Sequence, residues 1–187
     1  MFGQEIDRAI LDGRFEETEE GLFVPSARSM VQGVFRYAKR GEPEELSTNL
    51  VVTQGLNYVV GVALKAVSPI TTWYVAPFSG DVAVQSTWTA TNFTANATEV
   101  TAYEAAARPA WVGGAVAAGA VDSFAAKAEI KATQDAVVIR GAGMLSSSAK
   151  SGTIGTLLGA SRFPSAKTLD EDEILDIGYG FTLTPVV

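Results

Sequence analysis

Alternating apolar and polar positions dominate the second half of the chain. The clearest example is "EILDIGYGFTLT" at residues 173–184, where every second side chain is apolar or aromatic. A period of two is typical of a β-strand with one buried face. The stretch 123–133 alternates in the same way, while "TTWYVAPF" at 71–78 and "DAVVIRGAGML" at 135–145 are more continuous runs that also indicate strands. Together they predict a mainly β protein with an antiparallel β-sandwich or jelly-roll-like domain.

One stretch has helical spacing instead. Within residues 49–66, apolar side chains recur at intervals of four, three and four, at Val52, Leu56, Val59 and Ala63. This spacing places them on one face of a helix. Asn49 precedes them and belongs to the residue types that cap helices well. The sequence therefore predicts one short helix with Asn49 as its N-cap.

A long segment without charge runs interrupts the strand-like sequences. Residues 86–123 are rich in threonine, alanine and glycine, and loops of this length inside compact domains usually serve a function or an interface. The segment contains Trp88 and Trp111, each of which can bury a large surface. Structural use of these tryptophans, together with Trp73, is the simpler interpretation. A cleft of stacked aromatic rings for a sugar is the alternative.

Blocks of charge set the first 45 residues apart. Residues 1–20 carry seven acidic side chains against two arginines, and residues 28–40 carry four basic side chains and no acid. Such blocks with few apolar anchors are typical of an arm rather than a core. We therefore predict an extended charged N-terminal arm at 1–45 and a β-rich domain at 46–187. The arm is either a flexible tail or a segment that becomes ordered on a neighbouring subunit.

The residue types that are absent exclude several kinds of chemistry. The chain has no cysteine and no histidine, which removes disulfides, thiolate metal sites, cysteine nucleophiles and every Ser-His-Asp triad. The net charge of −7 opposes nucleic-acid binding, which needs a basic surface. The N-terminus lacks the positive charge of a signal peptide, and no apolar run is long enough to span a bilayer. We expect a soluble protein made in the cytoplasm, with no catalytic, metal or cofactor-binding residues.

The stretch "MLSSSAKSGTIG" at 144–155 carries the strongest candidate chemistry. Ser147 and Lys150 form a Ser-x-x-Lys pattern, and a Lys-Ser-Gly pattern begins at the same lysine. Penicillin-recognising enzymes draw these two patterns from distant parts of the chain and add a Ser-Asp-Asn element. Here one lysine would have to serve both patterns, Ser-Asp-Asn is absent, and strand-like sequences lie on both sides. We interpret the stretch as a polar connection between two strands.

Two further motifs carry weaker signals. Five acidic residues cluster at 170–176, where a solvated turn is the simpler interpretation and a weak surface cation site is the alternative. Asn92-Phe-Thr94 and Asn96-Ala-Thr98 have the pattern of glycosylation sequons, which we expect to stay silent without a signal peptide.

Several segments, taken in order, resemble a group of small structural proteins encoded in the virion gene cluster of tailed bacteriophages. The segments are "NLVVTQGLNYVVGVAL", "TWYVAPF", "EVTAYEAAARPAW", "AVDSFAAKAEI", "GMLSSSAKSGTIGTLLGASRF" and "DEILDIGYGFTLT". The resemblance implies a non-enzymatic virion protein made in the cytoplasm of the bacterial host. It most resembles a capsid decoration (cement) protein, which bridges major capsid subunits and forms dimers or trimers with copies of itself. It implies no contact with nucleic acid or membrane.

Two alternatives to the cement role remain open. One is a neck, tail or baseplate component of the virion. The other, from a different class, is a receptor- or carbohydrate-binding β module that uses the tryptophan-bearing loops. For the cement role we predict a partner interface formed by side chains of the basic run, the long loop and the Ser-Lys stretch. These residues are Arg28, Arg36, Tyr37, Lys39, Arg40, Trp88, Trp111, Ser147 and Lys150.

Overall fold

The structure, a computed structural model, describes the backbone of residues 15–17, 23–25 and 28–186 and the side chains of residues 31–184. The chain divides into two compact units, residues 32–182 and the remainder at both ends. In the smaller unit, β1 (Phe15–Glu17) and β2 (Phe23–Pro25) pair antiparallel, with Phe15 opposite Pro25.

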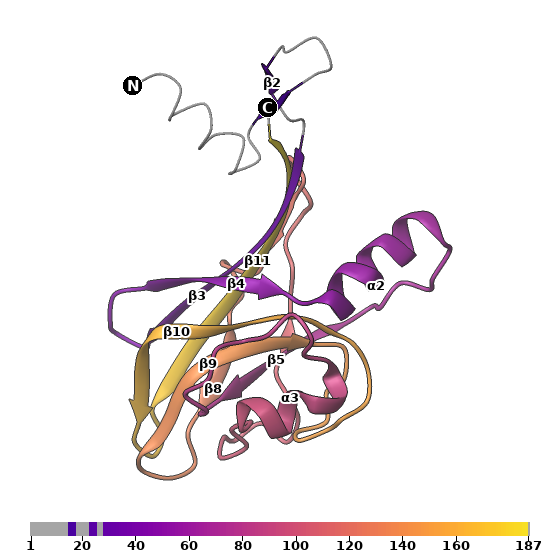
Figure 1. The fold of residues 1–187 in the computed structure, drawn as a ribbon. Helices are drawn as coiled ribbons and strands as arrows, with labels where there is room; N and C mark the ends of the chain where they lie inside the picture. Colours follow the sequence, from indigo (N-terminus) through magenta and orange to yellow (C-terminus); the bar gives the residue numbers. More distant parts are fainter. Residues whose placement is uncertain (1–14, 18–22, 26–27, 187) are drawn as a thin grey trace. The chain divides into compact units, whose positions relative to one another are not determined.

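The larger unit contains most of the main sheet and both helices found in the described part of the chain (Figure 1). The elements are, in chain order, β3 (Arg28–Lys39), β4 (Glu45–Val51), α2 (Thr53–Leu64), β5 (Trp73–Phe78), α3 (Ala90–Ala97), β6 (Ala110–Trp111), β7 (Ala120–Asp122), β8 (Ala128–Lys131), β9 (Val137–Leu145), β10 (Leu157–Leu169) and β11 (Ile174–Val186). The strands at 71–78, 123–133, 135–145 and 173–184 that the sequence predicts are confirmed as β5, β8, β9 and β11.

The strands form one antiparallel sheet that curls into a half-barrel. Its order is β6-β5-β9-β10-β4-β3-β11-β7, and β8 pairs with β11 beside this path. The mainly β, antiparallel prediction is confirmed, but the sheet is single where the sequence analysis expected the two packed sheets of a sandwich. A physical reason lies in β10, where the register against β9 shifts between Arg162 and Lys167. Such irregularities bend a strand and let one sheet curve around its own core.

The predicted helix exists but differs in its start and in its buried face. It begins at Thr53, and its N-cap residue is Val52. Asn49 lies within β4 and donates from its side-chain amide to the Tyr179 hydroxyl at 3.0 Å. The prediction of Asn49 as N-cap is therefore wrong. Gly55 and Gly61 are the buried residues of α2, while Leu56, expected on the apolar face, is exposed. The apolar spacing predicted the helix correctly without indicating which side faces the core.

A second helix, α3, lies inside the long segment that the sequence analysis assigned to a loop. Its N-terminus is capped because the Thr89 backbone N–H donates to Asn92 Oδ1 at 2.8 Å. Phe93 of α3 is fully buried between Phe78 and Trp88. A Cβ on Gly143 of β9 would lie 2.6 Å from the Phe93 ring, so this glycine makes room for α3 against the sheet. The prediction of one helix is thus corrected to two within the described residues.

Two hydrophobic clusters form the core of the larger unit. One contains the aromatic side chains of β3, β10 and β11, and the other contains α3 with the neighbouring parts of β5, β9 and β10. The Gln54 side-chain oxygen accepts the backbone N–H groups of Ala90 and Leu157, at 2.9 and 2.8 Å. This amide ties the first turn of α2 to the start of α3 and to the start of β10.

Residues 32–45, which the sequence analysis placed in the extended arm, belong to the compact unit. They form most of β3 and lead into β4, and Phe35 and Tyr37 are completely buried. Arg36 lies between these two buried residues, because alternate side chains of a strand point to opposite faces. The arm residues 1–14, 18–22 and 26–27 lie outside the described residues.

Candidate functional site

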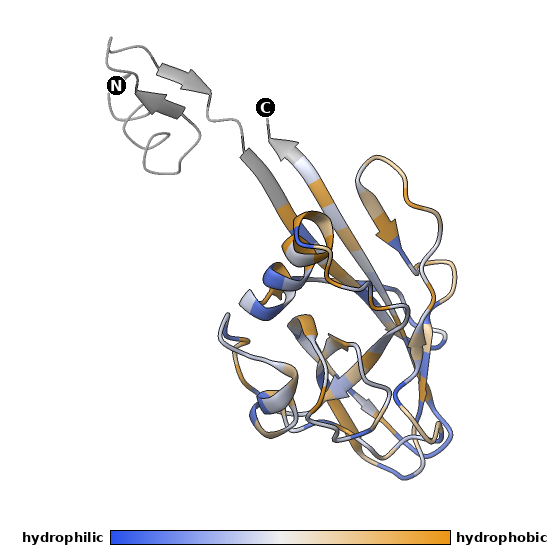
Figure 2. Cartoon of the chain, turned by 90° about the vertical axis from the view of Figure 1, so that its right-hand side faces the viewer, coloured by the Kyte–Doolittle hydropathy of each residue, from blue (hydrophilic) through white to orange (hydrophobic). Residues whose placement is uncertain are grey.

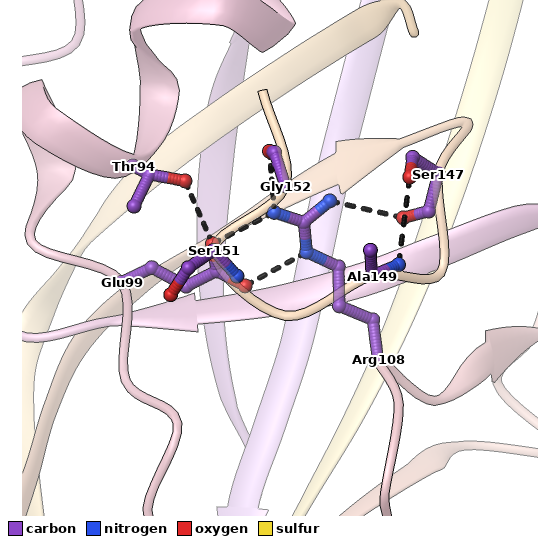
Figure 3. A network of polar contacts seen from close by, with 7 residues as sticks. All are labelled: Thr94, Glu99, Arg108, Ser147, Ala149, Ser151 and Gly152. Carbon is purple, nitrogen blue, oxygen red and sulfur yellow. Dashed lines mark hydrogen bonds and ion pairs between the residues drawn. The ribbon is translucent and has the colours of Figure 1, made fainter. Parts of the chain in front are cut away.

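A buried ion pair stands beside the Ser-Lys stretch. Arg108 and Glu99 both have side chains with no exposed surface. Arg108 Nε donates to one carboxylate oxygen of Glu99 and Nη2 to the other, each at 2.7 Å (Figure 3). This two-pronged arrangement matches the flat guanidinium to the flat carboxylate and is the strongest form of such a pair.

The same pair holds the connection between β9 and β10. Arg108 Nη1 donates to the backbone oxygen of Ser147 at 2.9 Å, and Nη2 donates to that of Gly152 at 3.1 Å. Glu99 accepts the backbone N–H of Ser151 at 3.1 Å and the Thr94 hydroxyl at 2.9 Å. Both buried charges are therefore satisfied by hydrogen bonds as well as by each other. The pair contributes little net stability against an apolar replacement, but it fixes the path of this connection.

Ser147 and Lys150 have separate hydrogen-bond partners. The ammonium of Lys150 donates to the backbone oxygens of Thr101 and Tyr103, at 3.0 and 2.7 Å, and lies 3.6 Å from the centre of the Tyr103 ring. Partial burial lowers the pKa of Lys150, but no hydrogen bond joins it to Ser147 within the described residues. The Ser147 hydroxyl instead accepts the backbone N–H of Ala149 at 3.4 Å. The prediction that this stretch connects two strands is confirmed.

The basic residues of the predicted interface are mostly engaged within the chain. Lys39 pairs with Glu173 at 2.5 Å. Arg40 pairs with Asp176 and Glu129, at 2.7 and 2.5 Å. The positive charges of Lys39 and Arg40 are therefore each matched by acidic side chains of the same chain.

Two arginines of the basic run differ from these. The guanidinium of Arg36 lies 4.1 Å from the centre of the Phe124 ring, in a cation–π contact. Arg28 lies in β3, and its side chain is outside the described residues. Whether either one contacts a partner stays a prediction.

The predicted aromatic interface residues have separate surroundings. Tyr37 is completely buried and stacks on Phe163 with 3.8 Å between ring centres, and burial is the main cause that raises its pKa to about 12. Trp88 is 5% exposed and packs against Phe93. Trp111 is partly buried and donates from its indole nitrogen to the Tyr179 backbone oxygen at 2.9 Å. The rings of Tyr37 and Trp88 are thus covered by the chain itself, and whether Trp111 contacts a partner stays a prediction.

An apolar cavity of about 180 Å³ lies between α2 and the sheet. Its walls include Tyr58 of α2, Trp73 of β5, Trp111 of β6 and Phe181 of β11. Apolar walls of this kind accommodate a hydrocarbon group better than a polar one.

Exposed apolar side chains gather in two uncharged segments, and their exposure was not predicted from the sequence. The first is the outer face of α2, defined here by Leu56, Val60 and Leu64, which are 38%, 54% and 77% exposed. Figure 2 views the side on which α2 lies and shows hydrophobic residues along this helix. The second is the loop 112–118 between β6 and β7, where Val112 and Val116 are 57% and 77% exposed. The sequence signal for the exposed face of α2 was the scarcity of charge, because residues 46–80 contain a single charged side chain, Lys65.

The acidic turn at 170–176 is occupied by the chain's own cations. Glu173 pairs with Lys39, Asp172 with Lys131 at 2.9 Å, and Asp176 with Arg40. Among the described residues, no group of three or more acidic side chains is placed to hold a metal ion. The described helices are also too short to cross a membrane.

Comparison of the chain with protein-family models, curated proteins and solved structures found no match. The site is therefore interpreted from its own geometry, in which a buried ion pair fixes one loop and two uncharged apolar segments face outward.

Proposed function

We propose that this chain is a non-enzymatic structural protein of a tailed-bacteriophage virion, which binds the outer capsid lattice and bridges major capsid subunits. The observation that carries the proposal is the concentration of exposed apolar side chains in two uncharged segments of an acidic chain. Apolar surface gathered in this way is typical of a surface that another protein covers. The resemblance in the order of sequence segments supports the assignment to virion proteins.

The internal hydrogen bonds of the Ser-Lys stretch support a structural role for it rather than catalysis. The Arg108–Glu99 pair fixes the backbone on both sides of Lys150. Ile154, at the end of the same connection, is 81% exposed. A loop that is already fixed loses little conformational freedom when it binds, which favours association. The loop therefore presents Ile154 to a capsid subunit in a defined place.

The mechanism is the addition of many weak contacts. A lattice offers the same surface many times, and subunits that are held at several sites separate only when all contacts break. Each copy then needs only a modest binding free energy, because linked contacts multiply the overall affinity. The loop 112–118 supplies such a contact, since it has no charge to desolvate and it exposes two valines.

The test uses particles of the phage that encodes this chain. We expect particles carrying Val116→Asp to contain at least about tenfold less of this protein than complete particles, because a buried aspartate is costly at an apolar contact. Those depleted particles should also lose infectivity sooner on heating and on osmotic shock. Thr133→Asp, which adds the same charge at another exposed position, is the matched control and should leave occupancy unchanged.

Other outcomes would replace the proposal. Particles that withstand heat and osmotic shock equally well without the protein would exclude a cement role. Localisation by cryo-electron microscopy at the neck, tail or baseplate would favour that virion position instead. A receptor-binding module would bind glycans through Trp73 or Trp111, since Trp88 is buried, and binding lost on Trp111→Ala would favour that class.

A further inference from the structure

The outer face of α2 is incomplete in the single chain. Its inner side packs on β10, where Gly55 approaches the Leu158 backbone. Its outer side carries Leu56, Val60 and Leu64, and the helix has no charged residue. A helix at a protein surface normally has a polar side that faces the solvent. On the solvent side of α2, Thr53 and Asn57 are the exposed polar residues, and the apolar ridge beside them is a surface that a partner can cover.

Charge indicates which partner fits. The chain carries a net charge of −7, so two copies repel each other over most of their surfaces. Residues 46–80 are one exception, because they contain no acidic side chain and only one basic one, Lys65. A second copy can therefore approach this region without bringing carboxylates together. The uncharged, apolar α2 face of one copy therefore suits the same face of a second copy.

The spacing of the three exposed residues suits a helix pair. Leu56, Val60 and Leu64 lie four residues apart and form one ridge along α2. Two such ridges pack side by side in the commonest class of helix contact in globular proteins. A two-fold axis near Val60 places Leu56 of one copy against Leu64 of the other. The two Lys65 side chains then lie at opposite ends of the pair.

The segment after α2 enlarges this surface. The helix is about 18 Å long at 1.5 Å per residue. Its outer face alone is too small for a standard interface, in which each partner buries about 800 Å². Val67 returns to the helix, because its backbone N–H donates to the Gly61 oxygen at 3.2 Å, and it is 45% exposed. Residues 65–69 are exposed throughout and extend the face beyond the helix.

We propose that α2 binds the α2 of a second copy of this chain, antiparallel and around a two-fold axis near Val60. This inference deepens the proposed function and rests on it for the setting, a lattice in which copies adjoin. It divides the two apolar surfaces between two partners. The α2 face binds a second copy, and the loop 112–118 binds the capsid.

The first test measures association of the purified 187-residue chain by analytical ultracentrifugation between about 1 and about 100 µM. We expect a monomer–dimer equilibrium. Val60→Asp should raise the dimer dissociation constant by at least about 100-fold, because two aspartates would face each other in an apolar contact. Val116→Asp, the same substitution outside α2, should leave the equilibrium unchanged. Circular dichroism and thermal unfolding show whether each variant is folded.

The second test uses the absence of cysteine from the chain, so that an introduced thiol is the only one. Val60→Cys should form a disulfide-linked dimer under mild oxidation, since the two Cβ atoms near the axis come within disulfide reach. Leu56→Cys mixed with Leu64→Cys should cross-link preferentially as the mixed pair, which identifies the antiparallel arrangement. Val116→Cys is the control and should cross-link much more slowly.

The outcomes separate this inference from the proposed function. A chain that stays monomeric, or Val60→Cys that cross-links no faster than Val116→Cys, overturns the α2 pair and leaves the capsid role untouched. A monomeric chain whose Val60→Asp variant is lost from particles assigns the α2 face to the capsid instead. A dimer that disappears only when residues 1–31 are removed assigns the contact to the N-terminal segment. A dimer of the expected form in a protein absent from particles refutes the virion role alone.

Discussion

The Arg108–Glu99 pair and the α2 helix reverse the usual placement of charge. Arg108 and Glu99 carry full charges and have no exposed side-chain surface. α2 carries no charge at all and exposes leucine and valine. In most domains ionised side chains stay at the surface and large apolar ones enter the core. The same structure thus contains a charged pair in its interior and an apolar helix face at its surface.

The difference lies in whether the interaction partners belong to the same chain. The buried pair has all of its partners inside, since the loop carbonyls of Ser147 and Gly152 and the hydroxyl of Thr94 complete its hydrogen bonds. It is a finished unit whose role is to hold a loop. The outer face of α2 has no counterpart within the described residues, and the proposed dimer assigns it one in a second copy of the chain. Mutation of the buried pair should therefore lower the free energy of unfolding, whereas mutation of the outer face of α2 should weaken association between copies.

The largest expected effect comes from removing one half of the buried pair. Arg108→Met leaves the Glu99 carboxylate buried without its cation and frees the two loop carbonyls. We expect the free energy of unfolding to fall by about 3–5 kcal/mol. Urea denaturation followed by tryptophan fluorescence measures this loss.

Two variants sharpen the result. The double variant Arg108→Met with Glu99→Leu removes both charges and should lose clearly less stability than Arg108→Met alone. Arg40→Met breaks an exposed set of ion pairs and should change stability far less. If Arg108→Met were as mild as Arg40→Met, the pair would not hold the loop.

The strands could be predicted from the sequence because their pattern is local. Residues 173–184 alternate over twelve positions, and β11 follows that alternation with Leu175, Ile177 and Tyr179 buried. α3 was missed because "ATNFTANA" contains threonine and asparagine, which are poor helix formers. Its start depends on hydrogen bonds from the backbone N–H groups of Thr89 to Asn92 and of Ala90 to Gln54, and its burial depends on space above Gly143. A curled single sheet was likewise beyond the local pattern, because register shifts are a property of paired strands.

The candidate site could be predicted only in part, for the same reason. The Ser-Lys stretch was correctly placed between two strands, because its flanks have strand-like patterns. Arg108 was not identified from the sequence, since nothing in the sequence pairs it with Glu99. The exposure of α2 depends on which side packs on β10, and Gly55 rather than a leucine lies against Leu158 of that strand. The lack of charge in residues 46–80 was the one signal that could have identified the α2 face.

An intermediate effect tests how α2 is seated. A Cβ on Gly55 would lie 2.0 Å from the Leu158 backbone oxygen, whereas one on Gly61 would lie 3.0 Å from a methyl group of Val67. Alanine normally favours a helix over glycine by about 1 kcal/mol. We expect Gly55→Ala to reverse this sign and lower the free energy of unfolding by about 1–3 kcal/mol, because backbone cannot move aside as easily as a side chain. Gly61→Ala should be milder.

The Gly55 variant also bears on association. Displacing α2 from β10 should weaken the dimer without changing the loop held by Arg108. The measurements are thermal unfolding for both alanine variants and sedimentation for the dimer. A Gly55→Ala variant more stable than the native chain would show that α2 is not packed on Leu158 in solution.

The smallest expected effect concerns an exposed ion pair, which is charged like the Arg108–Glu99 pair and lies at the surface like α2. The Lys39 ammonium beside Glu173 lowers the pKa of that carboxyl, so the folded state favours the ionised form. The resulting stability is present above the unfolded glutamate pKa of about 4.3 and is lost as the pH falls toward the lower folded pKa. Lys39→Met should therefore reduce the loss of stability on acidification, and at pH 7 it should shift the melting temperature by no more than about 2 °C.

Lys65→Met, at the end of α2, removes the same charge and should leave the acid dependence unchanged. Melting temperatures measured from pH 3 to 7 for the three proteins decide the point, and equal acid dependence in all three would assign Glu173 no part in it.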